Sequence, residues 1–193
     1  NIPTVTTKTP RIVKFNVGFE KSSKPIDIVI SIDVSGSTGE PNGYMNEVAD
    51  YEAIMLYALI NEAKRNNQKV GLTLWSDDIT YTSLPQTYDY TEVEKLKEVI
   101  FKGYWSCGTT NIYDALVQAR KYSDKLFLMF TDGEVSTSDL IDVDNVVFFL
   151  IKPEEVYYNE FVKRYGKHRV IRIEDLQNIP KVTLTWFKKH FSR

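Results

Sequence analysis

The chain has 193 residues, enough for one large domain or for one domain with an appendage. Its 42% apolar and 26% charged residues are close to the soluble globular average, and 13% aromatic residues argue against disorder. A formal net charge of −2 provides no basic field that would attract nucleic acid or an acidic membrane. No apolar stretch approaches the roughly 20 residues of a membrane helix, so we expect a soluble protein that does not insert into membranes.

The single cysteine, Cys107, excludes an internal disulfide framework and any multi-cysteine metal site. Proteins without disulfides are typical of reducing compartments, so we expect a cytoplasmic location. The chain begins at Asn1 rather than at methionine, and the lack of a signal peptide within it therefore says little about targeting.

The first predicted element is an extra strand near the N-terminus. Residues 13–20 alternate apolar and polar side chains, which is the period of a half-buried strand. A polar turn ends at residue 25. We expect residues 1–25 to form a strand and turn packed on the edge of the domain, and residues 26–193 to form the domain itself.

The next predicted strand, residues 26–32, carries isoleucine at alternate positions and Val29 on the other face, so we expect burial on both sides. A loop of small residues, 33–43, follows it. The helix expected in residues 48–63 has apolar residues at spacings of three and four. The further elements predicted in chain order are strand 69–75, a more polar strand 79–84 at a sheet edge, helix 91–100, helix 112–122, strand 125–131, a short helix, strand 145–152, helix 153–165, strand 168–173 and helix 180–191.

This order of elements predicts the fold class. Residues 125–131 and 145–152 are continuous apolar runs, which are typical of central parallel strands covered by helices on both faces. Strands alternate with helices through most of the chain. We therefore expect an α/β fold with a Rossmann-like, doubly wound, mostly parallel sheet and helices on both faces.

Polar residues follow three of the apolar segments, at the carboxyl ends of strands where open α/β sheets bind ligands. The segments are Asp33-Val34-Ser35-Gly36-Ser37-Thr38, Gly108-Thr109-Thr110-Asn111 and Thr131-Asp132-Gly133-Glu134. Alternate residues of an extended chain point the same way, so Asp33, Ser35 and Ser37 can offer a carboxylate and two hydroxyls to one point. With Thr110 and Asp132 added, the set contains only oxygen ligands, which suits Mg²⁺ or Mn²⁺ and argues against zinc or copper.

At these three segments the sequence resembles the von Willebrand factor type A (vWA) domain. The metal-ion-dependent adhesion site (MIDAS) of that family consists of an Asp-x-Ser-x-Ser loop, a distant threonine and a distant aspartate. The resemblance implies that Ser35, Ser37 and Thr110 contact the metal directly or nearly so. It also implies that Asp33 and Asp132 act largely through bound water, and that one coordination position is left for a carboxylate from a partner protein.

The resemblance extends from about residue 26 to residue 191 and includes three departures from the family pattern. Thr109 replaces the commoner second glycine before the metal-binding threonine. Thr38 stands where the family often has an apolar residue, and the loop 39–46 is long. These departures concern the rim of the site.

The function that the resemblance implies is non-enzymatic: a divalent metal grips an aspartate or glutamate of a protein partner. Intracellular members of the family often serve beside AAA-type ATPases or as subunits of other complexes, and we expect a partner of that kind. Each segment also has a purely structural interpretation. The hydroxyls of residues 33–38 could cap the next helix, Thr110 and Asn111 could cap helix 112–122, and residues 131–133 could form a turn.

The alternative function is that of a Mg²⁺-dependent phosphatase of the haloacid dehalogenase type, with Asp33 as the nucleophile. Residues 33–38 look superficially like the Asp-x-Asp-Gly-Thr loop of those enzymes. Their second aspartate serves as the general acid, and Ser35 occupies its place here. A serine hydroxyl does not deliver a proton near neutral pH, so the sequence favours the interaction domain.

Overall fold

The structure, a computed structural model, describes residues 26–83, 104–106 and 108–191. In these ranges six strands form one sheet with the order β3-β2-β1-β4-β5-β6. The strands are β1 (Ile28–Asp33), β2 (Val70–Trp75), β3 (Ile79–Ser83), β4 (Leu126–Thr131), β5 (Val146–Ile151) and β6 (Val170–Ile173). Neighbouring strands are parallel, except that β3 pairs with β2 antiparallel. The predicted strand 79–84 lies at a sheet edge over residues 79–83, and residue 84 lies outside the described residues.

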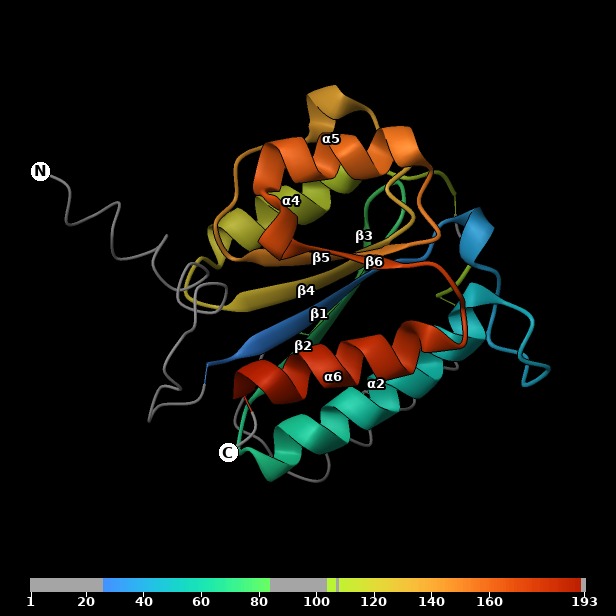
Figure 1. Cartoon of the computed structure of the whole chain (residues 1–193), viewed down its shortest axis with the longest axis vertical. Helices are drawn as coiled ribbons and strands as arrows, with labels where there is room; N and C mark the ends of the chain where they lie inside the picture. Colours follow the sequence, from blue (N-terminus) through green and yellow to red (C-terminus); the bar gives the residue numbers. More distant parts are fainter. Residues whose placement is uncertain (1–25, 84–103, 107, 192–193) are drawn as a thin grey trace, which may run out of the picture.

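Helices cover both faces of this sheet (Figure 1). On one face lie α2 (Val48–Arg65) and α6 (Asn178–Phe191), and on the other lie α4 (Ile112–Lys121) and α5 (Glu155–Tyr165). Short 3₁₀ turns, η1 (Gly36–Thr38), η2 (Thr137–Asp139) and η3 (Lys167–Arg169), connect some of the elements. The predicted doubly wound α/β fold is confirmed. None of the described helices combines the length and the apolar character needed to cross a membrane.

Two hydrophobic clusters, one on each face, account for the central position of the apolar strands. Every residue of β1, β4 and β5 is buried. In β1, Ile30 and its alternate neighbours pack in the cluster that contains α2 and α6, whereas Val29 packs in the cluster that contains α4. Phe130 and Phe149 stack between neighbouring strands, with ring centroids 4.7 Å apart. Alternate side chains of residues 26–32 therefore point to two faces of the sheet, and both faces are buried, as expected.

Some predicted boundaries differ from the structure. The strand expected at 168–173 begins at Val170, because residues 167–169 form the turn η3, in which Arg169 N donates to Gly166 O at 3.1 Å. Helix α6 begins at Asn178, before Pro180, since proline in the first turn has no N–H that needs an intrahelical partner. The predicted strand 13–20, the predicted helix 91–100 and Cys107 lie outside the described residues.

The strand order places the carboxyl ends of β1 and β4 side by side. From β1 the chain proceeds to β2 and β3 on one side, and it later returns to the other side of β1 to form β4, β5 and β6. The order of strands thus reverses between β1 and β4. In open α/β sheets such a switch point is where ligands bind, because the connections leave the two strand ends in opposite directions and open a crevice.

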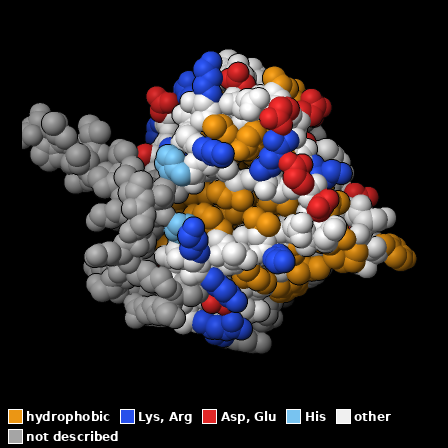
Figure 2. All heavy atoms as spheres, viewed as in Figure 1, with side chains coloured by type: hydrophobic (Ala, Val, Ile, Leu, Met, Phe, Trp, Pro, Cys, Tyr) orange, Lys and Arg blue, Asp and Glu red, His pale blue; other side chains and the backbone are white. Residues whose placement is uncertain are grey.

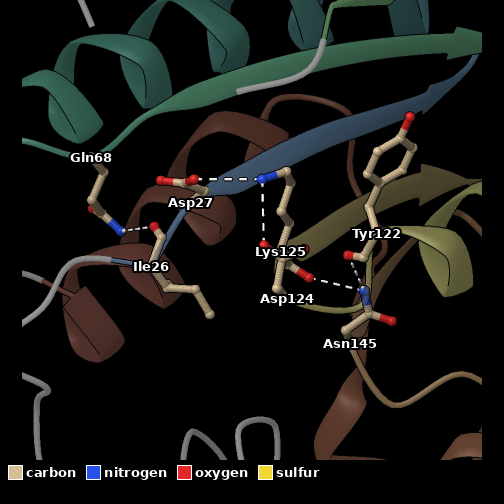
Figure 3. A network of polar contacts seen from close by, with 7 residues as sticks. All are labelled: Ile26, Asp27, Gln68, Tyr122, Asp124, Lys125 and Asn145. Atoms are coloured by element: carbon tan, nitrogen blue, oxygen red, sulfur yellow. Dashed lines mark hydrogen bonds and ion pairs between the residues drawn. The ribbon is translucent and has the colours of Figure 1, made fainter. Parts of the chain in front are cut away.

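The amino ends of the same strands are held by a separate network of polar contacts (Figure 3). The buried Asn145 donates from Nδ2 to the carbonyl oxygens of Tyr122, at 3.1 Å, and Lys125, at 2.9 Å. Lys125 also pairs with Asp27 at 3.6 Å, and Gln68 Nε2 donates to Ile26 O at 3.2 Å. These contacts hold the start of β1 against its neighbours. They lie at the amino ends of the strands, and the switch point lies at the carboxyl ends.

Candidate metal centre

Asp33, the last residue of β1, lies at the base of the switch point and is only 1% exposed. Its Oδ1 accepts a hydrogen bond from Ser35 N at 2.9 Å, and its Oδ2 accepts one from Thr131 Oγ1 at 2.8 Å. Thr131 is the last residue of β4. The Asp33 carboxylate therefore joins the ends of the two strands between which the order reverses.

Hydroxyl groups extend from this carboxylate toward solvent. Ser35 Oγ lies 3.4 Å from Ser37 Oγ, and Ser37 Oγ lies 3.4 Å from Asp132 Oδ2. Both distances are long for hydrogen bonds between oxygens. Neighbouring oxygens around a Mg²⁺ ion at ligand distances near 2.1 Å are about 3 Å apart, so these oxygens would approach one another by about 0.4 Å on sharing that ion. Ser35 is buried and Ser37 is exposed, so the row runs from the interior to the surface.

The threonine segment lies against the same loop. Gly36 N donates to Gly108 O at 3.2 Å, and Asn111 N donates to Ser76 O at 2.7 Å, just after β2. Thr110 is half-buried between these two anchored residues. The structure thus brings four of the predicted site residues into one chain of contacts and brings the backbone around the fifth, Thr110, to the same place.

Asp77, which the sequence analysis did not single out, holds the threonine segment. Its Oδ1 accepts hydrogen bonds from Thr109 N at 2.7 Å and Thr109 Oγ1 at 2.5 Å, and these donors hold the pKa of Asp77 below its usual value. Asn111 Nδ2 donates to Asp77 O at 2.9 Å. Gly108 has φ +61°, and a Cβ there would collide with the Asp77 carboxylate. Thr109, which stands where the family commonly has a second glycine, therefore supplies two hydrogen-bond donors to the Asp77 carboxylate.

Two of the structural interpretations are confirmed and are compatible with metal binding, whereas the hydroxyls of residues 33–38 do not cap α2, whose N-cap is Glu47. Asp132 Oδ1 accepts a hydrogen bond from Glu134 N at 2.9 Å in a turn that needs Gly133 at φ +81°, while its other oxygen faces Ser37. Asn111 caps α4 through a hydrogen bond from Tyr113 N at 3.1 Å. Each of these side chains uses one oxygen to fix a loop, and Asp132 keeps a second oxygen for a ligand.

The electrostatics of the site favour a bound cation. Burial raises the pKa of Asp33, and the nearby Asp132 carboxylate raises it further, while hydrogen bonds from Ser35 and Thr131 offset part of the shift. A divalent ion would compensate both carboxylates. In the described ranges, no group of three or more histidine, cysteine, aspartate and glutamate side chains is arranged to hold a metal ion. The candidate centre consists instead of two carboxylates and neighbouring hydroxyls.

A loop with exposed hydrophobic side chains, called the rim loop here, follows the Asp33 segment along the chain. Tyr44 is 83% exposed and Met45 is 38% exposed, and both lie in the long loop between η1 and α2. Figure 2 shows hydrophobic side chains in that part of the surface, at the right of the view. Tyr113, 46% exposed, lies in the first turn of α4, just after the threonine segment. Apolar surface therefore accompanies the loops that carry the polar site.

Asp50, in the first turn of α2, fixes this long loop. Its Oδ1 accepts hydrogen bonds from Asn42 N at 2.8 Å and Gly43 N at 2.9 Å, and its Oδ2 accepts one from Glu47 N at 3.2 Å. Burial alone would raise the pKa of Asp50, but these backbone donors more than offset it and hold the pKa below its usual value. The rim loop is thus anchored by a charged side chain.

Comparison with solved structures bears on the fold. No family model matches the sequence, and no curated protein matches it. Among solved structures, BatB from Bacteroides thetaiotaomicron is 18% identical with a TM-score of 0.61, over 86% of this chain and 98% of BatB. Proximal thread matrix protein 1 from the mussel byssus, in a structure with a zinc-occupied MIDAS motif, is 16% identical with a TM-score of 0.62. That match covers 88% of this chain and 49% of the matrix protein.

A third structure, the pilus adhesin SpaC from Lactobacillus rhamnosus GG, is 13% identical with a TM-score of 0.65, over 89% of this chain and 31% of the adhesin. The chain thus matches nearly the full length of BatB but half or less of the other two proteins. These likenesses confirm the predicted vWA-like, Rossmann-like α/β fold.

Proposed function

We propose that this chain is a non-enzymatic interaction domain that binds Mg²⁺ or Mn²⁺ and presents the ion to an aspartate or glutamate of a protein partner. The proposed metal-binding residues are Asp33, Ser35, Ser37, Thr110 and Asp132. The observation that carries the proposal is the row of oxygens at the switch point, which runs from the buried carboxylate at the end of β1 to an exposed hydroxyl.

The charges of these residues suit such a role. Two carboxylates roughly neutralise a divalent ion, whereas hydroxyl and water ligands donate little charge and leave the ion attractive to a further carboxylate. The bound ion would attract the partner's carboxylate, and the residues of this chain would hold the ion in position. Ser37 and the half-buried Asp132 lie on the solvent side of the row, where a partner can approach. Tyr44 and Tyr113 would add apolar contact area beside the ion.

The comparisons support the coarser part of this proposal. The mussel matrix protein has a zinc-occupied MIDAS motif, so a divalent metal suits a site on this fold. We favour Mg²⁺ or Mn²⁺ because the proposed ligands here are all oxygens. For the partner, we propose a protein of the cytoplasm, an AAA-type ATPase or another complex subunit. Intracellular vWA domains often serve beside such proteins, and the single cysteine favours the intracellular group over the extracellular adhesion domains.

The geometry of Asp33 argues against the alternative phosphatase. A nucleophilic aspartate must present a free oxygen to the phosphorus atom of its substrate. Asp33 is 1% exposed, and each of its carboxylate oxygens accepts a hydrogen bond from the protein. The buried Ser35, at the position of the general acid, donates no proton near neutral pH.

Calorimetric titration of chelator-treated protein tests the metal site. Mg²⁺ and Mn²⁺ should each bind to one site, and Asp33→Ala should weaken binding by about tenfold or more, because it removes a carboxylate from the centre. Asp27→Ala is the matched control, since Asp27 lies at the opposite edge of the sheet and pairs with Lys125. Unchanged binding in Asp33→Ala would contradict the assignment.

Capture of a partner tests the use of the ion. The immobilised domain should retain a protein from native extract in Mg²⁺, release it in EDTA, and fail to retain it as the Ser37→Ala or Thr110→Ala variant. Phosphatase activity in the wild type that disappears in Asp33→Asn would instead establish the enzyme. Capture that persists in EDTA would refute the adhesive role of the metal.

A further inference from the structure

A third acidic side chain near the candidate metal centre in the fold, Glu52, is buried. It belongs to α2, the helix that packs against η1. Its helical neighbours Ala49, Met55 and Leu56 are fully buried in the hydrophobic core, and Glu52 itself is 1% exposed. A carboxyl group on the buried face of a helix is costly unless it has a polar or charged partner.

The protein itself does not satisfy this group. Glu52 Oε1 is buried and, among the described residues, has no hydrogen-bond partner. Burial raises the pKa of Glu52 well above its usual value, and the Asp33 and Asp132 carboxylates raise it further. Both of those aspartates belong to the proposed metal centre, and α2, which carries Glu52, contacts η1 of the same centre.

We infer that Glu52 is a third acidic group of the metal centre, acting on the bound cation through a buried water molecule that its free oxygen holds. The inference rests on the proposed function. A water between the cation and Oε1 would satisfy the unpaired oxygen. Glu52 is not one of three direct acidic ligands, because the described residues contain no such cluster. The cation would in turn offset the repulsion among the three carboxyl groups.

The test is calorimetric titration of Mg²⁺ into chelator-treated Glu52→Gln, which keeps the size of the side chain and removes its charge. Because partners of metal ligands typically contribute this much, we expect Mg²⁺ affinity to fall about 10- to 100-fold. The melting temperature in EDTA should stay the same or rise, since a neutral amide does not carry the cost of burying an ionisable carboxyl group. Glu62→Gln is the matched control: Glu62 is also buried on α2 but pairs with Arg65 at 2.8 Å.

The possible outcomes separate this inference from the proposed function. Weaker Mg²⁺ binding in Glu52→Gln but not in Glu62→Gln supports it. Wild-type affinity in Glu52→Gln, combined with weak binding in Asp33→Ala, refutes the role of Glu52 and leaves the proposed function standing. A wild type that binds no Mg²⁺ refutes both. If Glu52→Gln does not fold, Glu52→Met, an apolar side chain of similar length, is titrated in its place with the same criterion.

Discussion

At the scale of single residues, the acidic side chains at the switch point differ in how the protein compensates their charge. Asp33 accepts hydrogen bonds at both oxygens, and Asp132 accepts one within its own turn. Glu52 Oε1 accepts none from the described residues. The three groups thus form a series from well compensated to uncompensated. The uncompensated Glu52 is therefore the group whose replacement by a neutral residue should not destabilise the metal-free protein.

The pH dependence of stability follows from the raised pKa of Glu52. The unfolded chain releases this proton near pH 4.3, the usual value for glutamate, whereas the folded chain retains it to higher pH. The folded state therefore binds more protons in that window, and stability must fall as pH rises through it. In EDTA, urea unfolding should show wild type losing more stability than Glu52→Gln between pH 5 and pH 8. Parallel curves would contradict the buried, uncompensated state of Glu52.

At the scale of elements, two carboxylates anchor the loops that surround the site. Asp50 ties the loop between η1 and α2 to the first turn of α2. Asp77 ties the threonine segment to the end of β2. Both accept backbone N–H groups that would otherwise lack partners in irregular chain. The loops are therefore positioned by side chains rather than by regular secondary structure.

Replacement of Asp50 should destabilise the start of α2 and its loop together. Asp50→Ala removes three hydrogen bonds from backbone N–H groups, and loss of a helix cap alone typically costs about 0.5–2 kcal/mol. Asp50→Asn keeps one acceptor oxygen and should lose less. Because the pKa of Asp50 is lowered, its contribution is present above about pH 4 and is lost as pH falls through the folded-state value. Urea unfolding at pH 7 and pH 3 measures both effects; equal losses at the two pH values would contradict the charged anchor.

Replacement of Asp77 should weaken metal binding without unfolding the protein. Asp77→Ala removes the acceptor for both Thr109 donors, so Thr110 would be held less firmly, by the backbone hydrogen bonds on either side of it alone. We expect Mg²⁺ affinity to fall about tenfold, the usual effect of losing a group that orients ligands. The exposed neighbour Asp78 provides the control variant Asp78→Ala, which should bind Mg²⁺ with the affinity of the wild type. A large drop in melting temperature for Asp77→Ala would instead assign Asp77 to stability.

At the scale of the whole molecule, the sequence predicts the sheet and its switch point better than it predicts the supports of the site. The apolar runs of β4 and β5 and the isoleucines of β1 mark the central strands because burial on both faces leaves a local pattern. The hydrogen bonds of Asp77 and the influence of Asp33 and Asp132 on Glu52 join residues far apart in sequence, so no local pattern reports them. The sequence does carry a weak signal for each residue, since Asp77 follows an apolar strand and Glu52 interrupts an apolar helix face. Neither signal indicates a role until the three-dimensional neighbours of the residue are known.

The large core also predicts that the fold persists without metal. Hydrophobic clusters cover both faces of the sheet, and the described strands β1, β4 and β5 are buried along their whole length. A ligand that binds only the folded state adds stability by mass action, about 2.7 kcal/mol at a concentration 100 times its Kd. EDTA should therefore remove only this stabilisation, which is seen as a limited fall in the melting temperature. The far-UV circular dichroism should stay unchanged.

The matched control for this experiment is Asp33→Ala, whose melting temperature should not respond to Mg²⁺, because its weakened site would take up little metal at the same concentration. The wild type should respond in proportion to the logarithm of the Mg²⁺ concentration once the site is saturated. Loss of the helical dichroism signal on chelation would show that the metal holds the domain together. The oxygens at the switch point would then be a structural metal site rather than a device for binding a partner.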